Sequence, residues 1–251
     1  RGALEVLFCD TSQGIHACAA DIRRALARAT FESESGAAER VRPRDIAVLK
    51  RALEMRSLRI CNAWFSTFLT TKPYAEVERD FIEHCTFLKT MGATVVGVAE
   101  QGNSIQGRQD LPVFDAKPVN SEEEWAKLTD GLNKLGAKAR EMGMVLTYHH
   151  HMGTGVQTAA EIDRLMEETD SELVGLLYDT GHLVFSGEDE IAVLKKWLPR
   201  IRHVHLKDVR KQKLEEATAS KWSFLKSVKE GVFTVPGDGC TPACKLEACG
   251  N

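Results

Sequence analysis

Apolar and polar positions along the chain alternate between two periods, one typical of helices and one of buried strands. From residue 44 onward, apolar residues at helical spacing alternate with short apolar runs rich in β-branched residues. The expected helices span residues 21–27, 45–55, 75–91, 121–141, 158–166, 188–197 and 222–229. The expected strands span residues 4–8, 58–61, 93–98, 144–148, 173–177 and 201–206. Strand and helix units in this order predict parallel strand pairing through right-handed crossovers.

The fold class follows from this order and from the motifs at the turns. The strands are apolar throughout, which fits a sheet covered on both faces, either an open doubly wound sheet or a closed barrel. No G-x-G-x-x-G or G-x-x-x-x-G-K motif stands at a strand-to-helix turn, which argues against the nucleotide-binding open sheets. We therefore predict an α/β protein with a (β/α)8 TIM barrel, for which 251 residues is a normal length.

Both ends of the chain depart from this pattern. Residues 1–43 are mostly polar between their few apolar runs, so we expect an atypical first unit. Too few residues follow Gly239 for another helix and strand, so we expect the last barrel strand to be missing. The predicted organisation is one barrel domain at 1–239 and a divergent C-terminal tail at 240–251.

Composition and charge narrow the classes of function. The net charge is −3 at pH 7 and the chain has no basic stripe, so we expect no nucleic-acid partner. No apolar stretch approaches the roughly 20 residues that span a bilayer, and the first residues lack the apolar run of a secretory signal. We therefore expect no membrane association and a cytoplasmic protein. Three of the seven cysteines, Cys240, Cys244 and Cys249, lie in the tail at spacings that do not match a zinc site.

Three polar clusters follow apolar runs in successive units, at residues 148–155, 178–182 and 203–208. Because the carboxyl ends of parallel strands meet at one edge, we expect side chains from these clusters to converge there. Their imidazoles and carboxylates suit Mn, Co, Fe or Zn better than an all-oxygen Mg site. The candidate metal ligands are His149, Asp179 and His205.

The candidate ligands also have plainer interpretations. Asp179 directly follows a buried strand, and its alternative role is to cap the next helix. His205 shares a strand face with a second histidine but lies nearer the carboxyl end, which favours it as the ligand. In the triple-histidine run, His149 and His151 share one face and His150 points the other way.

Further residues at the same edge carry groups for acid–base chemistry. The candidate catalytic residues are His151, His182, Lys207, Asp208 and Glu100. Lys207 and Asp208 have the alternative of an ion pair on a solvated rim, and Glu100 that of a surface loop carboxylate. Trp64 and Phe65 follow the strand expected at 58–61, where they either wall a pocket or belong to the core.

With these residues identified, the chain resembles the inosose dehydratases of myo-inositol catabolism, which belong to the xylose-isomerase-like barrels. The resemblance covers roughly residues 44–239 and rests on motifs that include Y-H-H-H-M-G-T, D-T-G-H and H-V-H-L-K-D. The matching stretches are residues 62–65, 148–154, 161–166, 177–183, 203–210 and 231–239. The triple-histidine run separates this family from other sugar isomerases and epimerases of the superfamily.

The resemblance implies a hydro-lyase that dehydrates a keto-inositol (scyllo-inosose) to a trihydroxycyclohexane-dione. It also implies a divalent metal, Mn or Co, and the use of glutathione. Within the superfamily pattern, Asp179 and His205 match metal ligands directly, whereas His149 stands where relatives have a Glu. The last-strand Glu of that pattern has no counterpart here.

Two alternative functions remain open at this point. The first is a metal-dependent keto-sugar or sugar-phosphate isomerase or epimerase on the same barrel. The second is an inactive remnant of the barrel that binds or assembles without catalysis. Because related barrels often pair, a homo-oligomer is also possible, although no interface can be identified from the sequence. In the two enzymatic cases the partner is a small polyol or keto-sugar substrate.

Overall fold

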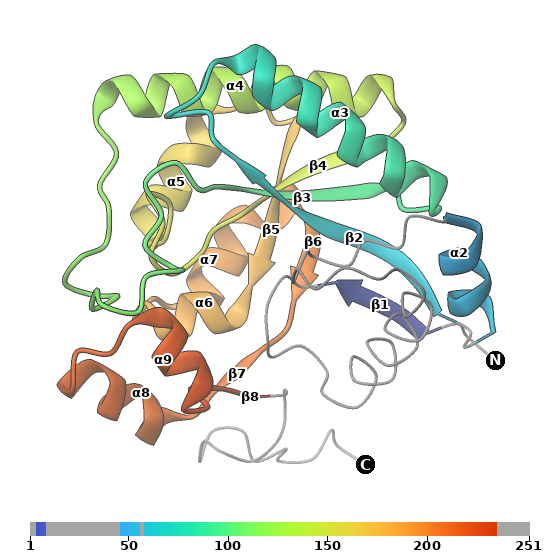
Figure 1. Cartoon of the computed structure of the whole chain (residues 1–251). Helices are drawn as coiled ribbons and strands as arrows, with labels where there is room; N and C mark the ends of the chain where they lie inside the picture. The colour runs from blue at the N-terminus through green and yellow to red at the C-terminus, as the bar shows by residue number, and fades with distance from the viewer. Residues whose placement is uncertain (1–3, 9–45, 56–57, 235–251) are drawn as a thin grey trace, which may run out of the picture.

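Six parallel strands form the central sheet of the protein. The computed structural model describes residues 4–8, 46–55 and 58–234. The strands lie in the sheet in chain order, and every neighbouring pair is parallel. They are β1 (Leu4–Phe8), β2 (Leu58–Thr67), β3 (Val95–Glu100), β4 (Val145–His149), β5 (Val174–Asp179) and β6 (Ile201–His205). Figure 1 shows this sheet curled into part of a barrel, which confirms the predicted fold class.

The helices that connect these strands cover the outer face of the sheet. They are α2 (Ile46–Glu54), α3 (Tyr74–Thr90), α4 (Glu122–Glu141), α5 (Ala159–Glu168) and α7 (Glu190–Trp197). Helices α4 and α5 both begin with a reciprocal capping box, in which the N-cap hydroxyl and a glutamate three residues later satisfy free backbone N–H groups. The apolar stripes of the helices pack on the strands and form one large core.

After β6 the described chain no longer follows the barrel pattern of alternating parallel strands and helices. Two short strands, β7 (Asp208–Val209) and β8 (Phe233–Thr234), form a separate antiparallel pair and do not extend the parallel sheet. The described residues thus contain six parallel strands, and the prediction of an incomplete (β/α)8 barrel is confirmed for them. Strand β2 also runs six residues further than the sequence predicted, because its apolar and aromatic residues continue the extended pattern to Thr67.

Two helices and one short turn were not foreseen. Helix α6 (Thr180–Phe185) begins inside the D-T-G-H motif, and α8 (Lys211–Ala219) lacks a clear apolar stripe, burying only Ala217. A 3₁₀ turn, η1 (Leu198–Arg200), leads into β6, and α9 (Phe224–Lys229) confirms the last predicted helix. The helix expected at 21–27 and the tail cysteines lie outside the described residues.

A second hydrophobic core lies at the carboxyl edge of the sheet, apart from the first. This cap cluster consists of Val113, Met152, Phe185, Val209, Ala217, Trp222, Phe224, Val228, Val232 and Phe233. Its parts are distant in sequence: the backbone N–H of Val113, in the loop between β3 and α4, donates to the carbonyl of Trp222 at 3.0 Å. Figure 1 shows α8 and α9 grouped beyond the end of β6. The cap cluster therefore joins a mid-chain loop to the C-terminal helices.

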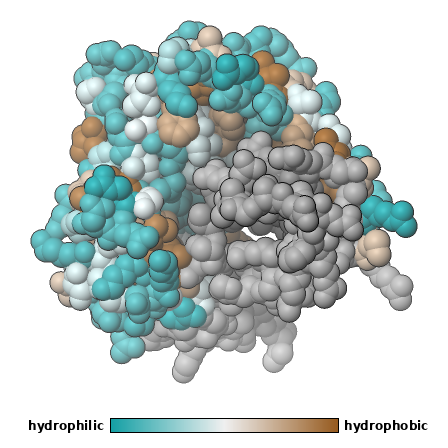
Figure 2. Space-filling view, viewed as in Figure 1, coloured by the Kyte–Doolittle hydropathy of each residue, from teal (hydrophilic) through white to brown (hydrophobic). Residues whose placement is uncertain are grey.

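One face of the described part of the molecule has a mostly polar surface. Figure 2 shows hydrophilic residues over most of the coloured surface on this face, interrupted by small hydrophobic groups. The helices of the described ranges are all too short or too polar to traverse a bilayer.

Candidate metal centre and active site

The three predicted metal ligands end three neighbouring strands. His149 is the last residue of β4, Asp179 of β5 and His205 of β6, and Asp179 lies opposite His205 in the strand register. His149 Nε2 lies 3.1 Å from Asp179 Oδ2, and His205 Nδ1 lies 3.4 Å from the same oxygen. The ammonium of Lys207 also contacts Asp179 Oδ2. The structure thus brings together side chains from three strands that are separated in the sequence by helical segments.

The D-T-G-H motif builds the side of the site that faces Lys207. The Thr180 hydroxyl donates to the Lys207 carbonyl at 2.7 Å and accepts from the Lys207 backbone N–H at 2.9 Å. A Cβ on Gly181 would lie 2.6 Å from the Lys207 Cβ, so a side chain at this position would displace the lysine. Asp179 is the N-cap of α6, because its Oδ1 accepts from the His182 backbone N–H at 3.1 Å. The capping role proposed as an alternative for Asp179 therefore coexists with its place in the cluster.

His182 joins the candidate ligands. One ligand atom from each of His149, Asp179 and His182 lies within 4.8 Å of the other two, and all three residues are buried. The sequence assigned His182 to proton transfer and His205 to the metal. The structure places both imidazoles near the same carboxylate: His182 belongs to the group of mutually close ligand atoms, and His205 Nδ1 lies 3.4 Å from Asp179 Oδ2.

Burial decides the charge state of these groups. Burial lowers the pKa of His149 and His182 well below the usual value and lowers that of His151 to about 3. Burial alone would raise the pKa of Asp179, but the positive charge of Lys207 and the hydrogen bonds from His149 and His205 hold it well below its usual value. The site therefore contains neutral imidazoles around an ionised carboxylate, which is the protonation state that metal binding requires.

The residues present fit a divalent cation. Among the described residues, the buried Nδ1 atoms of His149 and His182 have no hydrogen-bond partner. Unpaired buried nitrogen atoms are unfavourable unless something binds them. The imidazoles of His149 and His182 and the ionised carboxylate of Asp179 together give a mixed nitrogen and oxygen donor set of the kind that holds Mn, Co, Fe or Zn.

Aromatic rings enclose the histidines. The rings of His151 and His182 have centroids 3.9 Å apart. Trp64, on β2, contacts His149 and His151 edge-on at 5.2 and 5.5 Å, and Phe224 contacts His151 at 4.8 Å. Of the two interpretations of Trp64, the structure supports a wall beside the site. These rings limit the access of water to the imidazoles.

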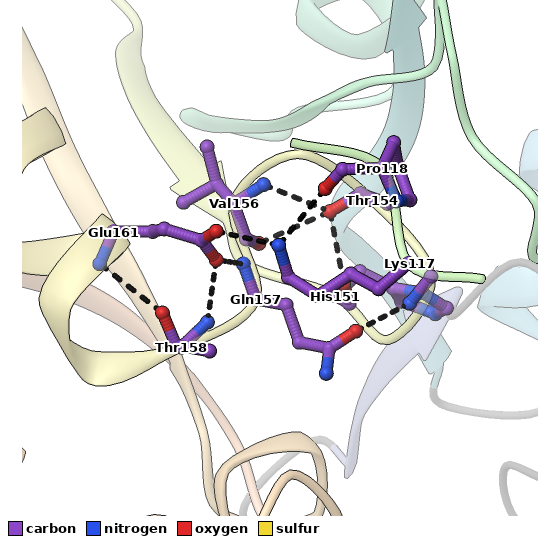
Figure 3. Close-up of polar contacts among 9 residues, drawn as sticks. Lys117, Pro118, His151, Thr154, Val156, Gln157, Thr158 and Glu161 are labelled. Carbon is purple, nitrogen blue, oxygen red and sulfur yellow. Dashed lines mark hydrogen bonds and ion pairs between the residues drawn. The ribbon is translucent and has the colours of Figure 1, made fainter. Parts of the chain in front are cut away.

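The loop that carries His151 is fixed by a polar network (Figure 3). Lys117 forms an ion pair with Glu161 at 2.5 Å, and both side chains are mostly buried. The other oxygen of Glu161 accepts from the backbone N–H groups of Gln157 and Thr158 at 2.8 and 2.9 Å.

Hydrogen bonds also hold the end of the loop nearer His151. The Thr154 hydroxyl donates to the His151 carbonyl, and the Gly153 backbone N–H donates to the Gln157 side chain. The loop after β4 is thus held at both ends.

Two predicted catalytic residues have other partners. Both oxygens of Glu100 are occupied by four donors: the hydroxyls of Thr67 and Thr70 and the backbone N–H groups of Leu69 and Gly102, at 2.8 to 3.0 Å. Glu100 is buried, so it is not the surface carboxylate of the plainer interpretation. This arrangement favours a role in shaping the loops after β2 and β3.

Asp208 lies in β7, one residue beyond Lys207. Its Oδ1 accepts from the backbone N–H of Val209 at 2.8 Å, and its backbone pairs with Thr234 of β8. The structure therefore places Asp208 in the antiparallel pair beneath the cap cluster rather than at the end of a barrel strand.

Some residues around the site could not be found from the sequence. Phe224 and Phe233 belong to the C-terminal segments, yet their rings lie against His182 at 5.9 and 5.4 Å. No local pattern links these residues to a histidine more than forty positions earlier. The sequence predicted that His150 points away from the face shared by His149 and His151. In the structure its Nε2 accepts a hydrogen bond from the Asp179 backbone N–H, and no pattern in the sequence indicated this contact.

The partial parallel barrel and the imidazole–carboxylate cluster at its carboxyl edge define the class of protein. The family model described as xylose isomerase-like TIM barrel matches residues 24–245, and the chain belongs to this family. The inosose dehydratase of Clostridium perfringens (strain ATCC 13124) is 62% identical over 197 residues, which are 78% of this chain and 66% of that protein. The match thus covers just under two thirds of the length of this relative.

Solved structures share the fold at much lower identity. The probable 3-DHS dehydratase of Bacillus anthracis is 14% identical, with a TM-score of 0.58 over 82% of this chain and 73% of that chain. The IOLI protein with a bound zinc atom is 18% identical, with a TM-score of 0.51 over 66% of this chain and 58% of that chain. At these identities the comparison supports the fold alone.

Proposed function

We propose that the chain acts as an inosose dehydratase, a metal-dependent hydro-lyase that converts a keto-inositol (scyllo-inosose) to a trihydroxycyclohexane-dione in myo-inositol catabolism. The observation that carries this proposal is the 62% identity to an inosose dehydratase over 197 residues.

The cation site of this proposal consists of His149 and Asp179, completed by His205 or His182. A bound divalent cation would act as a Lewis acid toward the ketone oxygen of the substrate. We propose Mn or Co in this role, since both suit mixed imidazole and carboxylate donors. The zinc atom bound by the IOLI protein supports a divalent cation on this fold.

The dehydration needs a base and an acid near the ring of the substrate. A proton leaves the carbon beside the ketone, a C=C bond forms, and the hydroxyl of the next carbon departs as water after receiving a proton. His151 and His182 are neutral, so either imidazole can accept the first proton. The ammonium of Lys207 lies against Asp179 and can donate the second. Glu100 and Asp208 are weaker candidates, because their carboxylates already accept backbone hydrogen bonds.

The remaining expectations form part of the same proposal. The substrate is a small polyol ketone, glutathione assists the reaction as the family resemblance implies, and the protein works in the cytoplasm. The net charge of −3 agrees with the absence of a nucleic-acid or membrane partner. A homo-oligomer is the assembly we propose, by analogy with related barrels.

The test is an assay with scyllo-inosose and either Mn or Co. We expect a product lighter than the substrate by one molecule of water, formed only when the cation is present. A product of unchanged mass would show an isomerase or epimerase instead. Cation uptake without any conversion of the substrate would show a barrel that binds but does not catalyse.

A further inference from the structure

The imidazole of His150 occupies a position where strand residues are usually apolar. His150 follows the last residue of β4 and is fully buried. Its Nε2 accepts a hydrogen bond from the backbone N–H of Asp179 at 3.2 Å. Because Nε2 accepts, the ring proton lies on Nδ1, which has no partner among the described residues. The ring is thus buried with one of its two nitrogen atoms unpaired.

The histidine meets one buried group and leaves another unpaired. Its Nε2 supplies the acceptor for the Asp179 backbone N–H, which a leucine of similar volume would leave unpaired, while its own Nδ1–H stays without a partner among the described residues. The paired register of β4 and β5 ends with His149 opposite Leu177. Beyond that point, the His150 ring links the two strands at Asp179.

Asp179 is oriented by contacts on three sides. Its backbone N–H donates to His150, and its Oδ1 accepts from the His182 backbone N–H. Only Oδ2 faces His149, His205 and Lys207. A rotation of the Asp179 backbone would turn Oδ2 away from the imidazoles that surround it.

We propose that His150 is a positioning residue: its Nε2 holds the backbone of Asp179 so that Oδ2 points at the cation. This inference rests on the proposed function, because it assumes that the cluster binds a cation. In this role His150 orients the ligand Asp179 through its backbone and does not itself bind the cation. Groups that orient a ligand from behind typically change metal affinity about 10- to 100-fold when they are removed.

The test compares two amides at this position. His150→Gln places an acceptor near the position of Nε2, whereas the side chain of His150→Asn is one methylene shorter and does not reach the Asp179 N–H. Both variants place a polar amide at the same buried position, so we expect similar losses in the free energy of unfolding. Leu146→Val, at a buried position of the same strand, controls for a general loosening of β4. Co²⁺ alone is titrated into the full chain, with its affinity and its visible absorption spectrum as readouts.

We expect His150→Asn to bind Co²⁺ at least about tenfold more weakly than the parent, with a changed spectrum. His150→Gln and Leu146→Val should stay close to the parent in both respects. In the cation-free protein, the Asp179 amide should exchange its hydrogen faster in His150→Asn than in His150→Gln.

Two results would overturn the inference, and only one of them would also overturn the proposed function. Equal Co²⁺ binding by His150→Asn and the parent would remove the positioning role and leave the proposed function untouched. A parent that takes up no stoichiometric Co²⁺ would overturn both together. If His150→Asn fails to fold, equal Asp179 amide exchange in His150→Gln and the parent supports the hydrogen bond, and faster exchange in His150→Gln contradicts it.

Discussion

His149 Nε2 and Asp179 Oδ2 lie 3.1 Å apart and join the carboxyl ends of two adjacent parallel strands. Both side chains are almost fully removed from water. A buried pair of this kind fixes the separation of two donor atoms before any cation arrives, since neither strand can shift without breaking the sheet. The rest of the site is arranged around this pair.

Asp179→Asn should abolish cation-dependent formation of the dione and lower cation affinity by at least about a hundredfold, because the charged ligand is lost. The fold should survive, since asparagine also caps helices and can still accept the His182 backbone N–H. Isothermal titration with Mn²⁺ and thermal unfolding measure the two effects. Asp189→Asn makes the same change at the N-cap of α7, away from the site, and should leave cation binding unchanged.

The stability of the cation-free protein should fall as the pH drops from about 6.5 toward 4. Burial lowers the pKa of His150 to about 4 and that of His151 to about 3. In the unfolded chain these histidines titrate near 6.5, so below that pH the unfolded state binds protons that the folded state does not. Each such histidine contributes a slope of about 1.4 kcal/mol per pH unit.

Urea unfolding at pH 7 and pH 5 measures this slope. His151→Gln should reduce it, because one of the buried imidazoles is then absent. An unfolding free energy that stays constant over this range would contradict the neutral state assigned to the buried histidines.

Glu100→Gln should lower the free energy of unfolding by about 1–3 kcal/mol and leave cation affinity close to that of the parent. The amide cannot accept from four donors as the carboxylate does, and its NH₂ group would face N–H or hydroxyl groups. Chemical unfolding and a cation titration check the two parts. Glu123→Gln, on the exposed side of α4, should change neither quantity. A large loss of turnover at saturating substrate, without a loss of stability, would instead return Glu100 to the catalytic residues.

Lys117→Met should destabilise the loop that carries His151. It leaves one oxygen of Glu161 without its buried cationic partner, at a cost of about 1–3 kcal/mol. The double variant with Glu161→Gln should cost less than the sum of the single changes, because the two groups act together. Lys127→Met breaks an exposed pair with Glu123 and should cost less than about 1 kcal/mol. Additive single changes in a double-mutant cycle would show that the Lys117–Glu161 pair is not coupled.

The sequence identified the parts of the site that belong to strand ends. Period-two alternation and the parallel topology were enough to bring His149, Asp179 and His205 to one edge, since strand register fixes where such residues lie. The same reasoning located the helices with a clear apolar stripe. It missed α8, whose burial is confined to Ala217, and it ended β2 too early.

The parts that the sequence did not reveal depend on tertiary contacts. Phe224 lies against His151 only because α9 packs on the loops above the sheet. The four donors around Glu100 come from the end of β2 and from the loops after β2 and β3, and no spacing along the chain shows that they meet. The shared position of His182 and His205 around Asp179 likewise depends on where α6 begins, within a motif too short to display helical periodicity.

The separate core of the cap cluster has a consequence for access to the histidines. Because Val113 and Trp222 tie a mid-chain loop to the last helices, the covering over His151 and His182 can be loosened without disturbing the strands that hold the donor atoms. Solvent entry and the geometry of the ligands at the strand ends therefore depend on two different sets of residues, and His182, which packs on Phe224 and Phe233, connects them.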